Sequence, residues 1–196
     1  MDHGGEPRRG RRRDGAPVLL RREGTTEITA QQVIERLGLE PLAGEGGMFR
    51  QTYLAADTVP RAALPSRYPH EKPVGSAIYY LLTDEPDSFS ALHRLPTDEI
   101  YHFYAGDPVE MLLLHPDGRG ERVRLGSAFM SGERVQFVVP RGTWQGSRLA
   151  PGGRWALLGT TMAPAYTDSD YDGGRRAELA ARHPEFAAEI RRLTRE

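Results

Sequence analysis

The sequence predicts an all-β protein, a sandwich or barrel of antiparallel strands, and two observations support this prediction. Between residues 49 and 162, short runs rich in β-branched and aromatic residues follow one another at regular intervals. The segments between these runs are tight-turn sequences such as His115-Pro116-Asp117-Gly118, and none is long enough for the helical crossover that parallel strands need. Because a closed sheet protects its edges, the jelly roll is among the expected forms.

A short helix is expected ahead of the strands. Thr29 and Gln32 have the spacing of a capping box, apolar residues follow at helical spacing, and Gly38 is a helix-stop signal. These signals predict a helix over residues 30–37. The strands expected after it are residues 49–54, 76–82, 89–95, 100–104, 109–115, 122–125, 135–139 and 155–162.

The two ends of the chain are expected to differ. A C-terminal helical segment is predicted over residues 177–182, and Pro184 at a first helical turn leads into a last helix that reaches Leu193. The first 25 residues are rich in Gly and Arg and have no apolar period. This composition predicts a flexible Arg/Gly-rich tail over residues 1–25, followed by a single domain over residues 26–196.

Composition excludes several kinds of chemistry and of partner. The chain has no Cys, which excludes disulfides, thiolate metal sites and a cysteine nucleophile. No apolar run approaches the roughly 18 residues of a membrane span, and no secretory signal is visible, so we expect a cytoplasmic protein without membrane contact. Seven arginines fall in the first 23 residues, which leaves the rest acidic and disfavours nucleic-acid binding. The acidic string at residues 167–172 is predicted to be a solvated loop.

The residues with the most evident chemistry lie at positions 89–106. The turn sequence Pro96-Thr97-Asp98 separates two expected strands, which predicts that His93 and Glu99 lie opposite each other and point into the same interior. A buried carboxylate beside an imidazole holds that imidazole in one tautomer. A general base and a set of metal ligands both require such an arrangement.

The spacing of these residues resembles the first motif of the cupins, which contains a His, a second His two residues later, a Glu four further on and a Gly seven beyond that. The positions in this chain are His93, Leu95, Glu99 and Gly106. In the second motif a Pro and a Gly precede a metal-binding His, and Pro140, Gly142 and Gln145 match its positions. Together with Glu45-Gly46-Gly47-Met48-Phe49-Arg50, Ser76-Ala77-Ile78-Tyr79-Tyr80-Leu81-Leu82 and Thr161-Met162-Ala163-Pro164, these motifs resemble the fifth cupin family over residues 34–193.

This resemblance implies a double-stranded β-helix, the cupin jelly-roll barrel, with a ligand cavity in its mouth and a homodimeric assembly. It also implies a metal-ligand set of His93, Glu99 and Gln145, although Leu95 and Gln145 replace two of the family's three histidines. Since a neutral amide is a weak ligand, we expect either no cofactor or one divalent metal ion. His102 lies three residues from Glu99, an odd separation that directs it to the opposite face of a strand unless a bulge intervenes.

The leading hypothesis is an enzyme that performs acid-base chemistry of the isomerase, epimerase or lyase type on a small polar metabolite. His93 is its expected base, Glu99 the partner of that base, and Tyr101 or Tyr79 the proton donor. The alternatives are a metal-dependent oxygenase or lyase and a cupin that binds a small molecule without turnover. The residues expected to contact the substrate are Arg50, His102, Phe103, Trp144 and Gln145.

Overall fold

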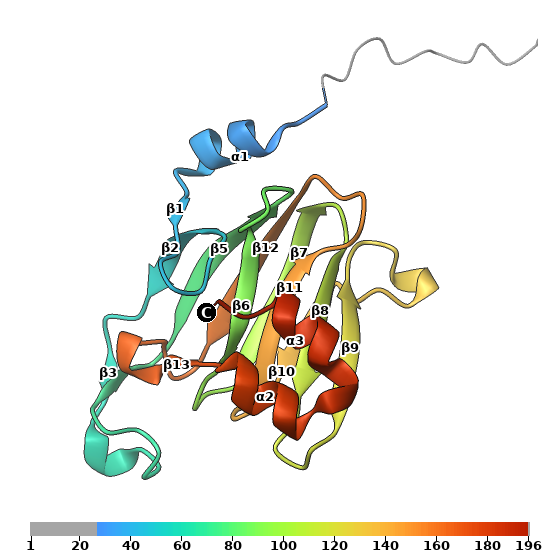
Figure 1. The fold of residues 1–196 in the computed structure, drawn as a ribbon. Helices are drawn as coiled ribbons and strands as arrows, with labels where there is room; N and C mark the ends of the chain where they lie inside the picture. Colours follow the sequence, from blue (N-terminus) through green and yellow to red (C-terminus); the bar gives the residue numbers. More distant parts are fainter. Residues whose placement is uncertain (1–26, 196) are drawn as a thin grey trace, which may run out of the picture.

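The computed structural model describes residues 27–195, so the predicted tail over residues 1–25 lies outside the described part of the chain. The first helix is α1 (Ala30–Leu37), as the sequence predicts (Figure 1). Thr29 and Gln32 form the reciprocal capping box, and Gly38 ends the helix with a φ of 61°, a left-handed conformation that glycine adopts without strain. Within the described residues no helix is both long and apolar enough to cross a membrane.

Two antiparallel sheets form the body of the protein, which confirms the predicted all-β architecture. The six-stranded sheet has the order β1 (Glu40–Pro41), β2 (Met48–Leu54), β5 (Ser76–Thr83), β12 (Trp155–Met162), β7 (Glu99–Gly106) and β10 (Gln136–Val139). The five-stranded sheet has the order β13 (Asp172–Gly173), β6 (Phe89–Arg94), β11 (Trp144–Leu149), β8 (Val109–Leu114) and β9 (Gly120–Leu125). Strands β3 (Thr58–Val59) and β4 (Lys72–Pro73) form a separate pair.

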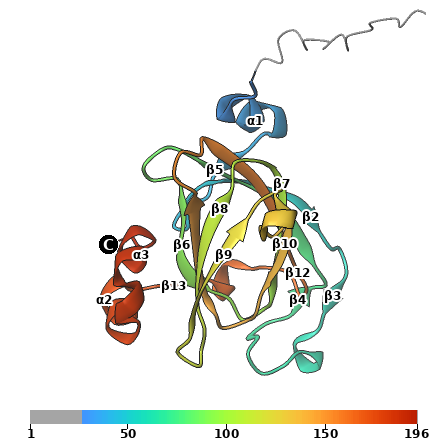
Figure 2. The same ribbon diagram turned by 90° about the vertical axis from the view of Figure 1, so that its right-hand side faces the viewer.

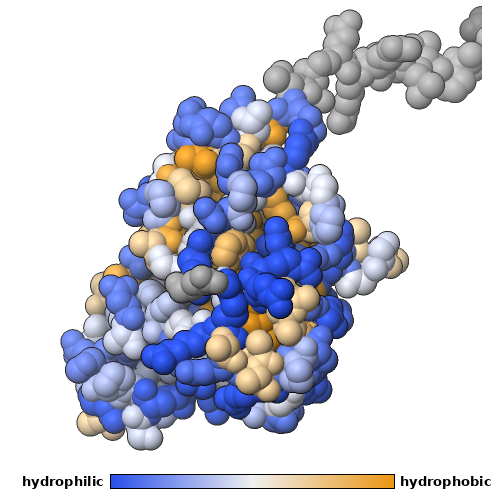
Figure 3. All heavy atoms as spheres, viewed as in Figure 1, coloured by the Kyte–Doolittle hydropathy of each residue, from blue (hydrophilic) through white to orange (hydrophobic). Residues whose placement is uncertain are grey.

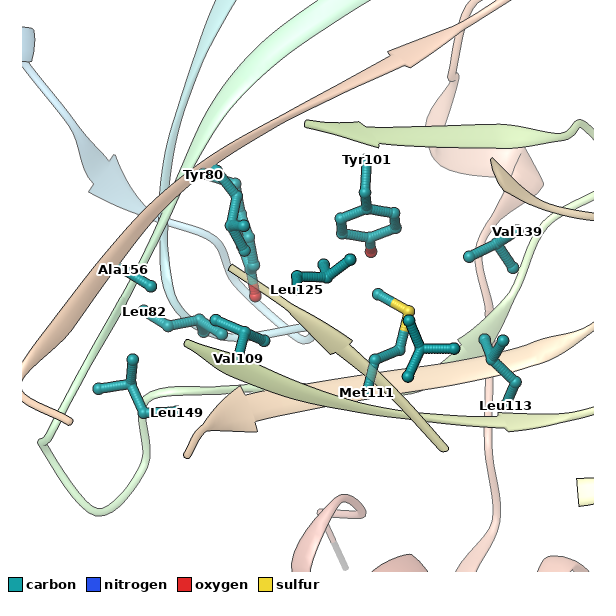
Figure 4. Close-up of a cluster of buried hydrophobic side chains, with 12 residues drawn as sticks. Tyr80, Leu82, Tyr101, Val109, Met111, Leu113, Leu125, Val139, Leu149 and Ala156 are labelled. Carbon is teal, nitrogen blue, oxygen red and sulfur yellow. The ribbon is translucent and has the colours of Figure 1, made fainter. Parts of the chain in front are cut away.

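The two sheets face each other and enclose the main core (Figure 2). Strand β12 pairs with β5 and β7 although it follows them by many residues, so the chain alternates between distant strands as a jelly roll does. Inward side chains from both sheets meet in a cluster that includes Tyr80, Tyr101 and Met111 (Figure 4). The hydroxyl groups of the two tyrosines point into this interior (Figure 4).

The C-terminal helices cover the outer face of the five-stranded sheet (Figure 2). Helices α2 (Arg176–Arg182) and α3 (Ala187–Arg192) lie on either side of a 3₁₀ turn at Pro184–Phe186, close to the predicted bounds. Leu179, Phe186 and Ile190 from this segment pack against Leu112 and Leu114 of β8. Three other 3₁₀ turns lie in connections, at Arg61–Ala63, Phe129–Ser131 and Asp168–Asp170.

Sequence patterns did not reveal the central strand β11. Its sequence, Trp-Gln-Gly-Ser-Arg-Leu, has no β-branched residue and contains a glycine, so it lacks the usual composition of a strand. Gly146 lies at a register shift between β11 and β6, where an added Cβ would be 3.0 Å from Leu92 Cγ. The missing side chain therefore allows the two strands to approach closely.

Candidate active site

His93 lies on β6 and is buried, with 1% of its surface exposed. Its Nδ1 is 2.8 Å from the carbonyl oxygen of Ala91. Since a carbonyl oxygen only accepts hydrogen bonds, Nδ1 carries the proton, and in the neutral ring Nε2 keeps its lone pair. Tyr171 stacks on the imidazole, with ring centroids 5.3 Å apart, and fixes the orientation of its plane. The local fold thus holds Nε2 ready to accept a proton.

Gln145 links His93 to Glu99. It lies on β11 directly opposite His93, and its Nε2 donates to Glu99 Oε2 at 2.6 Å. The same amide nitrogen is 3.4 Å from His93 Nε2. The structure therefore brings together three of the predicted site residues, with an amide group between the imidazole and the carboxyl. Gln145 Oε1 is buried and has no hydrogen-bond partner among the described residues, so it is an acceptor that a ligand can satisfy.

Glu45 belongs to this group, and the sequence analysis gave it no role. It lies in the turn between β1 and β2, where its Oε1 accepts from Ser90 Oγ at 2.7 Å and its Oε2 is 3.9 Å from His93 Nε2. Gly46 and Gly47 follow it with φ angles of 101° and 71°, and an added Cβ on Gly47 would lie 2.8 Å from Tyr80 Oη. The feature of the sequence that could have pointed to Glu45 is the pair of glycines that follows it, because adjacent glycines mark backbone in close contact with its surroundings.

The environment favours the protonated form of several of these groups. Burial is the main cause that raises the pKa of Glu99, and the charge of Glu45 raises it further, against the opposing effects of His93, Thr160 and Gln145. Burial likewise raises the pKa of Tyr101 and of Tyr80 well above the usual range for tyrosine. Both phenols therefore remain hydrogen-bond donors at neutral pH, inside the barrel and beside two carboxyl groups.

The raised pKa of Glu99 predicts a pH-dependent effect of Glu99→Gln. A carboxyl whose folded-state pKa lies above its ordinary value of 4.5 contributes full stability below that value and loses it as pH rises through the folded-state pKa. The glutamine variant has no such loss. Its free energy of unfolding relative to wild type should therefore increase from about pH 4 to about pH 8, by about 1.4 kcal/mol for each unit of pKa shift. Urea unfolding at both pH values measures this, and a difference that stays constant or decreases would contradict the assignment.

The structure places four residues with predicted roles in the site away from His93, so each of these four roles is corrected. Tyr79 packs on the outer face of the six-stranded sheet, and its neighbour Tyr80 takes the inward place because adjacent residues point to opposite faces. Arg50 donates to the carbonyl of Leu37 at the end of α1. Trp144 packs under the C-terminal helices, with the Arg94 guanidinium 4.7 Å from its ring.

The fourth is His102. Strand parity predicted its outer position correctly, and this position rules out the substrate contact that was also expected of it. Its Nε2 is 3.0 Å from Thr161 Oγ1, and its ring stacks on exposed Tyr104. The register shift between β12 and β7 occurs beyond it, at Leu157 and Leu158, so no bulge turns it inward.

Phe103 packs against the main core cluster and Tyr101 belongs to that cluster. Asp170, from the string predicted to be solvated, is a further correction: it is buried in an ion pair with Lys72.

The residues around His93 do not fit a resident metal ion. Among residues 27–195 no group of three His, Asp or Glu side chains is arranged to hold one. The amide nitrogen of Gln145 lies near both His93 Nε2 and Glu99 Oε2, and an NH₂ group is a donor and not a metal ligand. The buried Leu95 occupies the position of the family's second His, and a leucine side chain cannot bind a metal ion. The predicted set of His93, Glu99 and Gln145 is thus assembled as a hydrogen-bonded group.

Comparison with known proteins agrees with this barrel. A family model described as cupin superfamily (DUF985) matches residues 31–173. Protein SO0799 from Shewanella oneidensis is 32% identical, with a TM-score of 0.73 and a match that covers 86% of this chain and 99% of that one. A hypothetical protein from Leishmania major is 29% identical, with a TM-score of 0.74 and coverage of 86% and 100%. Uncharacterized protein YML079W of Saccharomyces cerevisiae is 28% identical in an alignment of length 166 that covers 74% of this chain and 77% of the relative. The chain therefore belongs to the cupin superfamily, in the family DUF985.

Proposed function

We propose that this cupin is an enzyme of the isomerase, epimerase or lyase type that performs acid-base chemistry on a small polar metabolite. The observation that carries the proposal is the fixed hydrogen bond from His93 Nδ1 to the Ala91 carbonyl, which leaves Nε2 as a base beside the Gln145 amide and 3.9 Å from Glu45 Oε2. In each of these reaction types a base first removes a proton from carbon. His93 Nε2 takes that proton, and the Tyr101 hydroxyl or protonated Glu99 returns one.

The charges around His93 favour a neutral or positively charged substrate. Glu45 and Glu99 are the ionisable acids of the site, and the nearby Tyr80, Tyr101 and Tyr171 hydroxyls have raised pKa values, about 12 for Tyr171, mainly through burial. An anionic substrate would be repelled by an ionised Glu45. Hydroxyl and amine groups instead suit carboxylate and phenol partners, and the unpaired Gln145 Oε1 adds one more acceptor.

Access to the base requires movement of the turn that carries Glu45. His93 and Gln145 are each 1% exposed, whereas the Glu45 side chain is 16% exposed. The turn contains three glycines with positive φ, Gly44, Gly46 and Gly47. It is held by the hydrogen bond from Tyr80 Oη to Gly46 O at 2.9 Å and by the one from Ala91 N to Glu45 O, also 2.9 Å. We expect a substrate to enter past this turn.

Hydrogen-deuterium exchange at carbon tests the proposed chemistry without knowledge of the substrate. The protein is incubated in D₂O with a panel of neutral sugars, polyols, amino sugars and amino acids, and deuterium at non-exchangeable C–H positions is measured by mass spectrometry. We expect incorporation into at least one neutral or cationic compound. Compounds that bind, as a rise in melting temperature shows, but never exchange would support the alternative of a binding protein without turnover.

We also propose a homodimer formed through the outer face of the six-stranded sheet. Tyr104 of β7 and Val138 of β10 are 51% and 47% exposed on that face, and Tyr104 makes ring contacts with His102 and Tyr79. Helix α1 packs on this face around Tyr79 and Leu81, and the exposed aromatic surface beside it suits a second copy of the same face. Light scattering should give twice the mass of one chain, and Tyr104→Glu should give a monomer. A monomeric wild type would refute this proposal.

A further inference from the structure

A pocket of about 270 Å³ lies on the opposite side of the protein from the aromatic sheet face, between α3 and the outer surface of the five-stranded sheet. We call it the arginine pocket, after the four arginines that line it. Figure 3 shows this side of the molecule, where hydrophilic side chains dominate the region over α3 and β9. Four arginines and two glutamates line the pocket, and they come from four strands and helices: Arg122 and Arg124 (β9), Arg148 (β11), Arg192 (α3), Glu110 (β8) and Glu189 (α3).

Two of these arginines are fixed by acidic neighbours. Arg122 forms an ion pair with Glu189, and its guanidinium lies 4.6 Å from the ring of Phe186. Arg124 forms ion pairs with Glu110 at 3.3 Å and with Glu133 at 3.0 Å. Both glutamates that line the pocket are therefore already engaged.

The other two arginines remain without ion pairs. Neither Arg148 nor Arg192 forms one with any residue in the described range 27–195. Burial acts to raise the pKa of Glu189, yet this pKa is lowered, because Arg122 hydrogen-bonds to the carboxyl and the charge of Arg192 adds to the effect. With Glu133, which pairs with Arg124, the four arginines and three glutamates leave one net positive charge. The two guanidinium groups without ion pairs can each pair with one negative charge of a doubly charged ligand.

The floor of the arginine pocket is apolar. Leu112 and Leu193 line it, and both belong to the buried cluster beneath the C-terminal helices. The volume lies just below the range of about 300–1,000 Å³ that is typical of small-molecule pockets, so it suits a compact ligand. A pocket with cations at its rim and leucines below accepts an anionic group attached to a small apolar body.

We propose that the arginine pocket binds the phosphate group of a small organic phosphate monoester, at a site separate from His93. A phosphate monoester is close to doubly ionised at neutral pH, since its second pKa is near 6. The planar guanidinium of arginine matches two phosphate oxygens at once. This site does not depend on the proposed acid-base centre. An anionic ligand is disfavoured near the carboxyl groups around His93, whereas the arginines of this pocket attract it.

Isothermal titration calorimetry with phenyl phosphate, inorganic phosphate and phenol tests the proposal on the full-length protein. We expect phenyl phosphate to bind at one site, more tightly than inorganic phosphate, and phenol not to bind. Arg148→Gln and Arg192→Gln should each weaken phenyl phosphate binding by about tenfold or more, because each removes a charge-assisted contact. Arg36→Gln, an exposed arginine on α1 outside the pocket, is the matched control and should change the affinity less than twofold.

Three results would overturn the proposal. One is the absence of saturable binding by phenyl phosphate. Another is binding that persists unchanged in the Arg148→Gln/Arg192→Gln double variant, since phosphate would then bind to arginines elsewhere, including those at residues 8–13. The last is an equal loss in Arg36→Gln, which would show a general effect of net charge. The proposed activity at His93 does not enter any of these measurements, so either proposal can fail alone.

Discussion

Replacement of Lys72 by methionine should lower the free energy of unfolding by about 3–5 kcal/mol. Lys72 is 2% exposed and forms a buried ion pair with Asp170, while its Nζ lies 2.6 Å from Thr167 Oγ1. Removal of the ammonium group leaves the Asp170 carboxylate buried without a counter-charge. Its Oδ1 already has no hydrogen-bond partner among the described residues. Urea unfolding monitored by circular dichroism measures the loss.

Two controls show that the loss comes from the unpaired buried charge. Lys72→Met/Asp170→Asn removes both charges and keeps a side-chain oxygen for the hydrogen bond from Thr167 N, so it should recover more than half of the loss. Arg175→Gln breaks an ion pair whose side chains are 81% and 67% exposed, and it should cost less than about 1 kcal/mol. A cost below about 1 kcal/mol for Lys72→Met would contradict the assignment.

The ion pair between Lys72 and Asp170 also lies next to the candidate active site. Asp170 ends a 3₁₀ turn, and the next residue is Tyr171, which stacks on His93. Lys72, on the short strand β4, thus anchors the segment that orients the imidazole. We infer that Lys72 is a positioning residue for His93.

His93→Gln should reduce deuterium incorporation into the substrate by about 10²–10⁴-fold, the usual contribution of a general base. Glutamine keeps a polar side chain at the position but has no basic nitrogen. His102→Gln is the matched control, because His102 lies on the outer face of the same barrel, bonded to Thr161. It should leave the exchange rate unchanged.

Two outcomes would contradict the role of His93. Exchange that continues at the wild-type rate in His93→Gln would assign proton removal to another group. An equal loss in both histidine variants would show that the loss has a structural origin. Melting temperatures of the two variants separate this second case, since a folded His93→Gln protein without exchange is the expected result.

The fold could be predicted from the sequence because its signals are local. The capping box at Thr29 and the glycine at position 38 give the bounds of α1, and eight strands follow from short apolar runs between turn sequences. Parity along β7 placed His102 outside the barrel correctly. It could not separate Tyr79 from Tyr80, because the run over Ser76–Thr83 is apolar at nearly every position and has no alternation to identify its inner face.

The rest of the site depends on contacts between distant parts of the chain. Glu45 reaches His93 only because β2 and β6 belong to opposite sheets that close into a barrel. Lys72 and Asp170 are 98 residues apart, and a lysine followed by proline gives no local sign of burial. Such pairings are set by tertiary packing and have no periodic signature in the sequence.

The tautomer of His93 tests the central claim most directly. ¹⁵N-¹H correlation spectra of the imidazole, recorded at a pH where the ring is neutral, report which nitrogen carries the proton. We predict a proton on Nδ1, donated to the Ala91 carbonyl, and an unprotonated Nε2 facing Gln145 and Glu45. A neutral ring protonated at Nε2 would mean that no lone pair faces Gln145 and Glu45, and His93 could not be the base.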